Sequence, residues 1–320
     1  MVSRRLAGQR WIMGEVAFIF PGQGSQSVGM GLTLARDFKV AAGTFAEADA
    51  ILGFSLSTLC FDGPGETLTE TCNAQPAILT TSVAAWRALR AAGSDVSDPI
   101  CVAGHSLGEY SALVAAGALD FADAVRLTRA RGELMASAGR AHPGSMAAIL
   151  RLEDDQVTAI CAEAAAETKD VVQVANYNSP GQVVISGGPA GVTAATALAK
   201  AAGARVMPLA VSVAAHSALM APTAEEFAAR VASVPFALPK TPVIGNVNAG
   251  PLNSVDELRN ELVAQLTSPV RWTASVSYMV GMGVERFIEI GPGSVLTGLI
   301  KRIAPGVETA NIAESGHIAA

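Results

Sequence analysis

The sequence predicts an α/β protein with a mainly parallel sheet and a smaller inserted subdomain. Short apolar runs that resemble buried strands alternate along the chain with Ala- and Leu-rich segments that resemble helices, and this alternation is typical of parallel strands joined by helices. The strand-like runs are residues 15–20, 99–104, 241–245 and 285–290, and the helical segments include 76–92, 107–117 and 120–138. With 320 residues, the chain is long enough for one large domain or for two that share an interface.

The middle of the chain predicts the inserted subdomain. A strand, a helix, two strands, a helix and a last strand follow one another at 145–151, 154–167, 171–177, 182–187, 189–202 and 205–210. This β-α-β-β-α-β order is typical of a ferredoxin-like subdomain, and a turn at Asn178-Ser179-Pro180-Gly181 suits a hairpin between its central strands. We therefore expect a core formed by residues 15–140 and 211–320, a subdomain at 141–210, and a ligand cleft between them.

The first 14 residues are expected to lie outside this core. They include Arg4, Arg5 and Arg10, and Met13 stands just before the first strand-like run. A targeting peptide needs a longer amphipathic stretch or an apolar segment. We therefore interpret residues 1–14 as a leader or an upstream-start extension.

Charge and composition exclude several classes of function. The formal net charge is −6, the isoelectric point is near 5.3, and no block of Lys and Arg is present, which argues against a nucleic-acid partner. No apolar run reaches the roughly 18 residues of a membrane span. The four cysteines are scattered without Cys-x-x-Cys spacing, so we expect reduced thiols in a cytoplasmic protein and no metal site.

The segment Gly104-His105-Ser106-Leu107-Gly108-Glu109-Tyr110 predicts a nucleophile. It lies between a strand-like run and a helical segment, and a Gly-x-Ser-x-Gly turn in that position presents its serine at the start of a helix. Backbone N–H groups there, including that of Leu107, are oriented to stabilise an oxyanion. An ordinary Gly-rich turn is the alternative interpretation.

An activated serine needs a base, and four histidines are available. His105 precedes Ser106 directly, so its side chain is expected to project away from the serine hydroxyl and to pack beside the turn. His216 follows the strand-like segment 209–213, at a strand end where α/β active sites gather. A buried structural histidine remains the alternative for His216. No acidic residue stands out as a partner that would orient it.

Two further residues are candidates for the site. Gln23, in the Gly-rich segment 20–26 after the first strand, offers an amide as a second oxyanion donor. A dinucleotide loop is disfavoured because position 27 is Ser27, and no phosphate-binding Lys follows. Arg131 can hold a substrate carboxylate with two parallel hydrogen bonds if its helix passes the cleft, whereas the neighbouring Arg129 is interpreted as a solvated surface residue.

Five segments in this order resemble the malonyl-CoA:acyl carrier protein transacylase family over residues 15 to about 311. They are Phe-Pro-Gly-Gln-Gly-Ser-Gln at 20–26, Gly-His-Ser-Leu-Gly-Glu-Tyr at 104–110, Arg-Gly-Glu-Leu-Met at 131–135, Asn-Ser-Pro-Gly-Gln-Val-Val at 178–184 and Glu-Ile-Gly-Pro-Gly at 289–293. The resemblance implies a core similar to α/β hydrolases, with a ferredoxin-like subdomain and a Ser-His dyad.

The resemblance also implies a role for each site residue. Ser106 is the nucleophile and His216 its base, and Gln23 lines the oxyanion hole with the backbone of Leu107. Arg131 holds the malonyl carboxylate, and the main-chain carbonyl of Gln265 orients the histidine. The implied reaction is ping-pong transfer of malonyl from malonyl-CoA to acyl carrier protein in fatty acid synthesis, without a cofactor, by a monomeric enzyme.

Other expectations and alternatives remain open. Residues 213–218, Val-Ala-Ala-His-Ser-Ala, depart from the family pattern around the histidine, so strict malonyl selectivity is the least secure expectation. Arg205, Lys301 and Arg302 are candidates for a basic patch that meets an acidic carrier protein, or else scattered solvated charges. A serine hydrolase or thioesterase, or a binding module without catalysis, are the competing functions.

Overall fold

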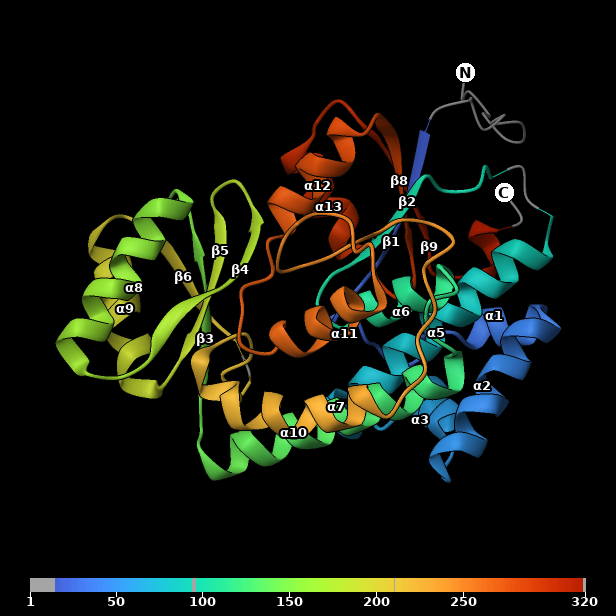
Figure 1. The fold of residues 1–320 in the computed structure, drawn as a ribbon, viewed down its shortest axis with the longest axis horizontal. Coiled ribbons are helices and arrows are strands. Elements are labelled where there is room, and N and C mark those ends of the chain that lie inside the picture. The colour runs from blue at the N-terminus through green and yellow to red at the C-terminus, as the bar shows by residue number, and fades with distance from the viewer. Residues whose placement is uncertain (1–14, 94–95, 210, 319–320) are drawn as a thin grey trace, which may run out of the picture.

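The computed structural model describes residues 15–93, 96–209 and 211–318, so the leader or upstream start predicted at 1–14 lies outside the described residues. Its strands form two sheets. One has five strands in the order β7-β2-β1-β8-β9, and the other has four in the order β4-β5-β3-β6. In Figure 1 the four-stranded sheet and its two helices lie at the left, beside the rest of the molecule. The protein is a mixed α/β structure, as predicted.

The larger sheet is parallel throughout. Its strands are β1 (Glu15–Phe20), β2 (Cys101–Gly104), β7 (Val243–Ile244), β8 (Val284–Ile290) and β9 (Glu308–Ile312). Phe18 and Phe20 of β1 pack into one apolar cluster, while Ala17 and Ile19 pack into another on the opposite face. Because helices cover both faces, the central strands are apolar without alternation.

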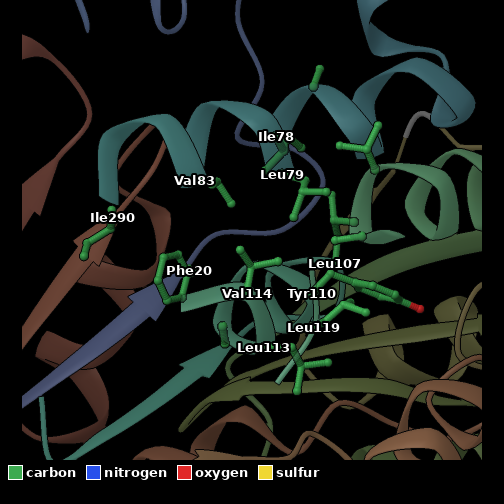
Figure 2. Packing of buried hydrophobic residues seen from close by; sticks show 14 of the residues in the cluster. Phe20, Ile78, Leu79, Val83, Leu107, Tyr110, Leu113, Val114, Leu119 and Ile290 are labelled. Carbon is green, nitrogen blue, oxygen red and sulfur yellow. The ribbon is translucent and has the colours of Figure 1, made fainter. Parts of the chain in front are cut away.

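Helices outside the residue range 145–208 cover this sheet. They are α1 (Leu32–Asp37), α2 (Lys39–Leu52), α3 (Leu56–Asp62), α4 (Gly65–Thr69), α5 (Thr71–Ala91), α6 (Gly108–Ala115), α7 (Phe121–Ala141), α10 (Ala221–Ala232), α11 (Val255–Ala264), α12 (Trp272–Gly281) and α13 (Val295–Ile303), with short 3-10 turns η1 (Ala218–Met220) and η2 (Ser315–His317). Figure 2 shows Ile78, Leu79 and Val83 of α5 pointing toward Phe20 of β1 and Val114 of α6. This packing fixes α6, and therefore the turn before it, against the end of β1.

The smaller sheet is antiparallel throughout. Its strands are β3 (Ser145–Leu150), β4 (Val172–Ser179), β5 (Gln182–Gly187) and β6 (Arg205–Pro208), and its helices are α8 (Asp154–Thr168) and α9 (Pro189–Ala201). Both helices share an apolar cluster with the sheet. Gly181, with φ of 69°, supplies the left-handed conformation in the turn between β4 and β5. The β-α-β-β-α-β order of elements predicted from the sequence is confirmed.

The structure differs from the sequence prediction in three places. Strand β9 is an edge strand with only partial burial, so it lacks the continuous apolar run that marks the central strands. The strand predicted at 241–245 is limited to Val243–Ile244, because Pro242 has no N–H to donate to a neighbouring strand. Helices α1 to α4 were not predicted; α1, α3 and α4 are short, whereas α2 has 14 residues.

Strand β4 of the smaller sheet is joined by backbone hydrogen bonds to the segment that precedes α12. The Tyr177 N–H donates to the Val270 carbonyl at 2.9 Å, and the Val270 N–H donates to the Ala175 carbonyl at 2.8 Å. Near this contact, His105 at the end of β2 is 2.8 Å from Asn178 Oδ1 of β4, measured from its Nε2. The carboxyl end of the parallel sheet therefore faces the smaller sheet.

The sequence composition also led to expectations about the cysteines, metal sites and membrane spans, which can be compared with the structure. Cys60, Cys72, Cys101 and Cys161 are all free. Among the described residues, no group of three or more His, Cys, Asp or Glu side chains is arranged to hold a metal ion. A helix with the length and apolar character to cross a membrane was not found among the described residues.

Candidate active site

Ser106 occupies a strained turn between β2 and α6. Its φ of 49° is left-handed, which is uncommon for a residue with a side chain. The glycines on either side allow the turn: a Cβ on Gly104 would lie 1.9 Å from the Gly108 carbonyl carbon, and a Cβ on Gly108 would lie 2.0 Å from the Phe20 oxygen. The strand-turn-helix geometry predicted for residues 104–110 is therefore present.

His216 lies within hydrogen-bond distance of this serine. Its Nε2 is 2.9 Å from Ser106 Oγ, and its Nδ1 is 2.7 Å from the main-chain oxygen of Gln265. A carbonyl oxygen can only accept, so Nδ1 carries the hydrogen and Nε2 accepts the proton of the serine hydroxyl. The structure therefore brings together three residues that lie far apart in the sequence.

The other histidines make different contacts. His105 is hydrogen bonded to Asn178 and packs edge-on against Trp272, with ring centroids 5.6 Å apart. His142 caps the end of α7, and His317 lies in η2 near the C-terminus. Among the described residues, only His216 contacts the Ser106 hydroxyl through an imidazole nitrogen.

The surroundings of His216 keep its imidazole neutral. Burial, followed by the charge of Arg131, lowers the pKa of His216 to about 3, from an ordinary value of 6.5. The imidazole therefore carries no charge at neutral pH. A neutral imidazole that already accepts a serine hydroxyl hydrogen bond has the protonation state that a general base needs.

Arg131 of α7 is a buried cation beside the serine. Its side chain is 2% exposed, and its Nη2 donates to Ser106 Oγ at 3.2 Å and to Gln265 Oε1 at 2.9 Å. Its Nη1 donates to Gln75 Oε1 at 2.8 Å, whereas Nε has no acceptor among the described residues. All these partners are neutral, and burial lowers the pKa of Arg131.

No described carboxylate forms an ion pair with Arg131. By contrast Arg129, which was interpreted as a solvated surface residue, is partly buried: it pairs with Glu133 at 2.5 Å and donates to Asn73 at 2.7 Å. A buried charge without a counter-charge is unfavourable. The position of Arg131 therefore favours an anionic ligand next to Ser106.

Gln23 and Leu107 lie on either side of the turn. A Cβ on Gly22 would be 2.4 Å from the His105 oxygen, so the loop after β1 runs directly against the turn that carries Ser106. Neither the Gln23 N–H nor the Leu107 N–H donates a hydrogen bond to another described residue. The side-chain amide of Gln23, which was the donor considered from the sequence, instead donates to Thr71 Oγ1 at 3.3 Å.

A cavity of about 760 Å³ opens onto these groups. Ser106, His216, Arg131 and Gln23 contribute to its wall. Apolar side chains form much of the remainder, and they are Met135, Ala136, Met146, Leu209, Val211, Val213 and Ala215. Gln265 lies behind the wall, where it contacts His216 and Arg131. The candidate carrier-binding residues Arg205, Lys301 and Arg302 are exposed and lie outside this wall.

Four polar residues of the site were not predicted from the sequence. Gln75 binds Arg131, Asn246 accepts from the Ser106 N–H at 2.7 Å, and Glu109 and Glu261 are buried beneath the turn. Glu109 lies inside the segment that identified the nucleophile, but only its burial in the folded structure reveals that it belongs to the site. The other three come from distant segments without a motif.

Comparisons with known proteins agree with this geometry. The acyl transferase domain family matches residues 17–315. The malonyl CoA-acyl carrier protein transacylase of Escherichia coli strain K12 is 48% identical over 309 residues, which is 96% of this chain and 99% of that protein. The Bacillus subtilis strain 168 protein of the same name is 45% identical over 303 residues, covering 94% of each chain.

Solved structures are similar over nearly the whole chain. An acyl carrier protein S-malonyltransferase from Vibrio cholerae superposes with a TM-score of 0.92 at 47% identity, covering 95% of this chain and 99% of that chain. A malonyl-transacylase solved in complex with a type II PKS acyl-carrier protein gives 0.91 at 45% identity, covering 95% and 98%. This chain is therefore an acyltransferase and belongs to the malonyl CoA-acyl carrier protein transacylase family.

Proposed function

We propose that this enzyme transfers a malonyl group from malonyl-CoA to the phosphopantetheine thiol of acyl carrier protein in fatty acid synthesis, through a malonyl-serine intermediate. The observation that carries the proposal is the Ser106–His216 pair with Nε2 2.9 Å from Oγ, next to a buried Arg131 that forms no ion pair with another described residue. The names of the relatives support the same reaction.

The first half-reaction forms the malonyl-serine ester. His216 Nε2 takes the hydroxyl proton while Ser106 Oγ attacks the thioester carbonyl. The resulting oxyanion is held by the N–H groups of Leu107 and Gln23, which have no other acceptor among the described residues. The carbon–sulfur bond then breaks, and the His216 proton passes to the departing thiolate, which leaves as coenzyme A.

The second half-reaction runs in reverse with a different thiol. His216 takes the proton of the phosphopantetheine thiol, the thiolate attacks the serine ester, and Ser106 leaves with the proton returned by His216. Both the donor and the acceptor are pantetheine thiols, so the exchange is close to thermoneutral. The apolar part of the cavity wall lowers the access of water, which would otherwise hydrolyse the ester.

Arg131 selects the acyl group in this proposal. Its planar guanidinium binds the free carboxylate of malonyl through charge-assisted hydrogen bonds. The carboxylate supplies the direct ion-pair partner that Arg131 lacks among the described residues. An acetyl group has no such charge and leaves the guanidinium buried without compensation.

We also propose the finer fold assignment predicted from the sequence. The core, formed by residues 15–140 and 211–320, is of the α/β-hydrolase type, and residues 141–210 form the ferredoxin-like subdomain. The parallel and antiparallel sheets support this division. The absence of a cofactor, the monomeric state, the cytoplasmic location and the basic carrier-binding patch stay predictions.

The proposed function is tested by the mass of the intact enzyme after brief mixing with malonyl-CoA. We expect one malonyl adduct, lost on addition of holo acyl carrier protein with formation of malonyl-carrier. Ser106→Ala should form no adduct, because its side chain has no nucleophile. An adduct that persists in Ser106→Ala contradicts the assignment. Loss of the wild-type adduct to water as fast as to the carrier indicates a hydrolase instead.

A further inference from the structure

A group of buried polar side chains lies beneath the Ser106 turn and does not reach the cavity. Glu109, Asn246, Glu261 and Gln265 are 0%, 1%, 6% and 0% exposed, respectively. They come from α6, from the loop after β7, and from α11 with the residue that follows it. Buried polar groups at this density are costly unless their hydrogen bonds are satisfied, so their pairing deserves a functional explanation.

Gln265 connects all three residues of the proposed chemistry. Its main-chain oxygen accepts the hydrogen bond from His216 Nδ1 at 2.7 Å. Its side-chain Oε1 accepts from Arg131 Nη2 at 2.9 Å, and its Nε2 donates to the Ser106 main-chain oxygen at 3.1 Å. The position of one glutamine therefore affects the base, the nucleophile and the cation together.

Glu109 fixes the orientation of the Gln265 amide. Gln265 Nε2 also donates a short hydrogen bond to Glu109 Oε2. A carboxylate only accepts and a guanidinium only donates. With Glu109 on one side and Arg131 on the other, only one of the two amide orientations satisfies both partners.

The same carboxyl group supports the turn through Asn246. The Asn246 N–H donates to Glu109 Oε1 at 3.3 Å. The Asn246 side chain in turn accepts from the Ser106 N–H and donates to the Gly104 oxygen, both at 2.7 Å. Asn246 therefore bridges Glu109 to the strained backbone that presents the nucleophile.

Glu261 completes the group from the other side. It accepts from the Val247 N–H at 2.7 Å and is hydrogen bonded to Glu109. Burial raises the pKa of both carboxyl groups, and the proximity of Glu261 raises that of Glu109 further. Both oxygens of Glu109 accept from N–H donors, and Glu261 contacts the same carboxyl group.

We propose that Glu109 is a positioning residue of this enzyme, held by Glu261, that sets Gln265 and so aligns His216, Arg131 and Ser106 for acyl transfer. Glu109 touches neither the substrate nor the reacting atoms. The inference rests on the proposed Ser106–His216 chemistry, but it concerns a different set of contacts and fails separately.

The test compares the rate of serine acylation per folded enzyme between the wild type and the Glu109→Gln variant. In Glu109→Gln one acceptor oxygen becomes an amide donor, so either Gln265 or Asn246 loses its partner. We expect single-turnover acylation by malonyl-CoA to slow about 10–100-fold, the effect of a small misalignment. Circular dichroism measures the fraction of folded protein, so that the rate can be given per folded enzyme. A rate per folded enzyme equal to that of the wild type overturns the proposal.

Glu289→Gln is the matched control. Glu289 is also 0% exposed and accepts hydrogen bonds from the Leu296 and Thr297 N–H groups, but it has no contact with the site. We expect this variant to lose stability while its acylation rate per folded enzyme stays at the wild-type value. A similar slowing in both variants means that Glu109 acts on folding in general, which overturns the proposal.

Two further comparisons test whether Glu109 acts through Gln265 and whether its contact with Glu261 matters. The losses in Glu109→Gln and Gln265→Ala should overlap rather than multiply in the double variant, because both act through the same amide. Glu261→Gln should retain far more activity than Glu261→Leu, since its amide keeps polar groups that can hydrogen bond to Glu109 and to the Val247 N–H. Multiplied losses, or equal losses in the two Glu261 variants, contradict the proposal. The wild-type adduct at Ser106 tests the underlying chemistry independently.

Discussion

The reactivity of Ser106 depends on a histidine that stays neutral because it is buried. Water would otherwise stabilise the imidazolium form, and the nearby guanidinium of Arg131 disfavours that form further. The Gln265 carbonyl fixes the tautomer without adding a negative charge. A carboxylate in that position would raise the pKa of His216, so its replacement by a carbonyl helps to keep Nε2 free to accept a proton.

The pH dependence of acylation follows from this arrangement. His216 must be neutral to act, and its pKa in the folded enzyme is lowered to about 3. As pH falls from 7, the imidazole therefore stays neutral well below its ordinary value of 6.5. We expect kcat/KM for acylation to stay flat from pH 7 to about 5 and to fall only as pH approaches the lowered pKa.

Rapid-quench mixing followed by intact mass measures this profile, with circular dichroism to confirm that the enzyme stays folded. The charge of Arg131 lowers the pKa of His216, and a malonyl carboxylate bound at Arg131 offsets that charge. The pKa of His216 should therefore be higher in the substrate complex, so kcat should fall at a higher pH than kcat/KM does. A limb of kcat/KM centred near 6.5 contradicts the neutral, buried histidine.

Arg131 should decide between malonyl and acetyl groups. In Arg131→Ala the two charge-assisted hydrogen bonds to the malonyl carboxylate are lost, each worth about 1.5–3 kcal/mol. We expect kcat/KM for malonyl-CoA to fall at least about 100-fold, while kcat/KM for acetyl-CoA falls less or rises. Competition between the two thioesters, read by adduct mass, gives the ratio. Unchanged discrimination removes Arg131 from substrate selection.

At the scale of elements, close backbone contacts position the catalytic groups. The loop after β1, the turn after β2 and the start of α6 approach one another so closely that Gly22, Gly104 and Gly108 leave no space for a Cβ. The packing of α5 and α6 against Phe20 holds these backbones together (Figure 2). The N–H groups of Gln23 and Leu107 therefore belong to two segments whose separation is fixed by backbone contact.

Gly108→Ala tests this contact. The added Cβ would lie 2.0 Å from the Phe20 oxygen, which is backbone and cannot rotate away. We expect a loss of at least about 3 kcal/mol in the free energy of unfolding. Gly43→Ala is the control, because Gly43 is exposed in α2 with open space around its Cβ position, and it should gain about 0.5–1 kcal/mol. Urea unfolding that gives equal values for the two variants is the contrary outcome.

At the scale of the whole molecule, residues from both the parallel-sheet part and the antiparallel-sheet part line the cavity. Ser106 and Arg131 come from elements beside the parallel sheet, whereas Met146 and Asn176 come from β3 and β4 of the antiparallel sheet. Val270, in the segment before α12, forms backbone hydrogen bonds with β4 next to this wall. A substrate in the cavity therefore contacts both parts at once.

Substrate binding should consequently stabilise both parts. Ser106→Ala cannot turn malonyl-CoA over, and at about 100 times its dissociation constant the ligand should add about 2.7 kcal/mol to the free energy of unfolding. Hydrogen exchange should slow both in the segment around Arg131 and in β3 and β4. Protection of one side alone contradicts a shared cavity. The same experiment with Arg131→Ala added should show much weaker protection at equal malonyl-CoA concentration.

Local patterns account for the success of the sequence predictions. Apolar runs mark β1, β2 and β8 because both faces of the central strands are covered, and the spacing around Ser106 marks its turn because only glycine fits there. Strand β9 and helices α1, α3 and α4 were not predicted, because partial burial and short length leave weak patterns. Helix α2 was also missed, although it has 14 residues. The side-chain direction of Gln23 toward Thr71 also depends on a neighbour that the sequence does not place.

The sequence by itself determined the alternation of elements, the strained serine turn and, through its resemblance, the family. Each of these depends on residues near one another in the chain. Only the tertiary structure decided that Arg131 lies beside the serine without a direct ion-pair partner among the described residues, and that Glu109, Glu261, Asn246 and Gln265 form one network under it. Burial and hydrogen bonding between distant segments arise only when the chain packs, so no local pattern records them.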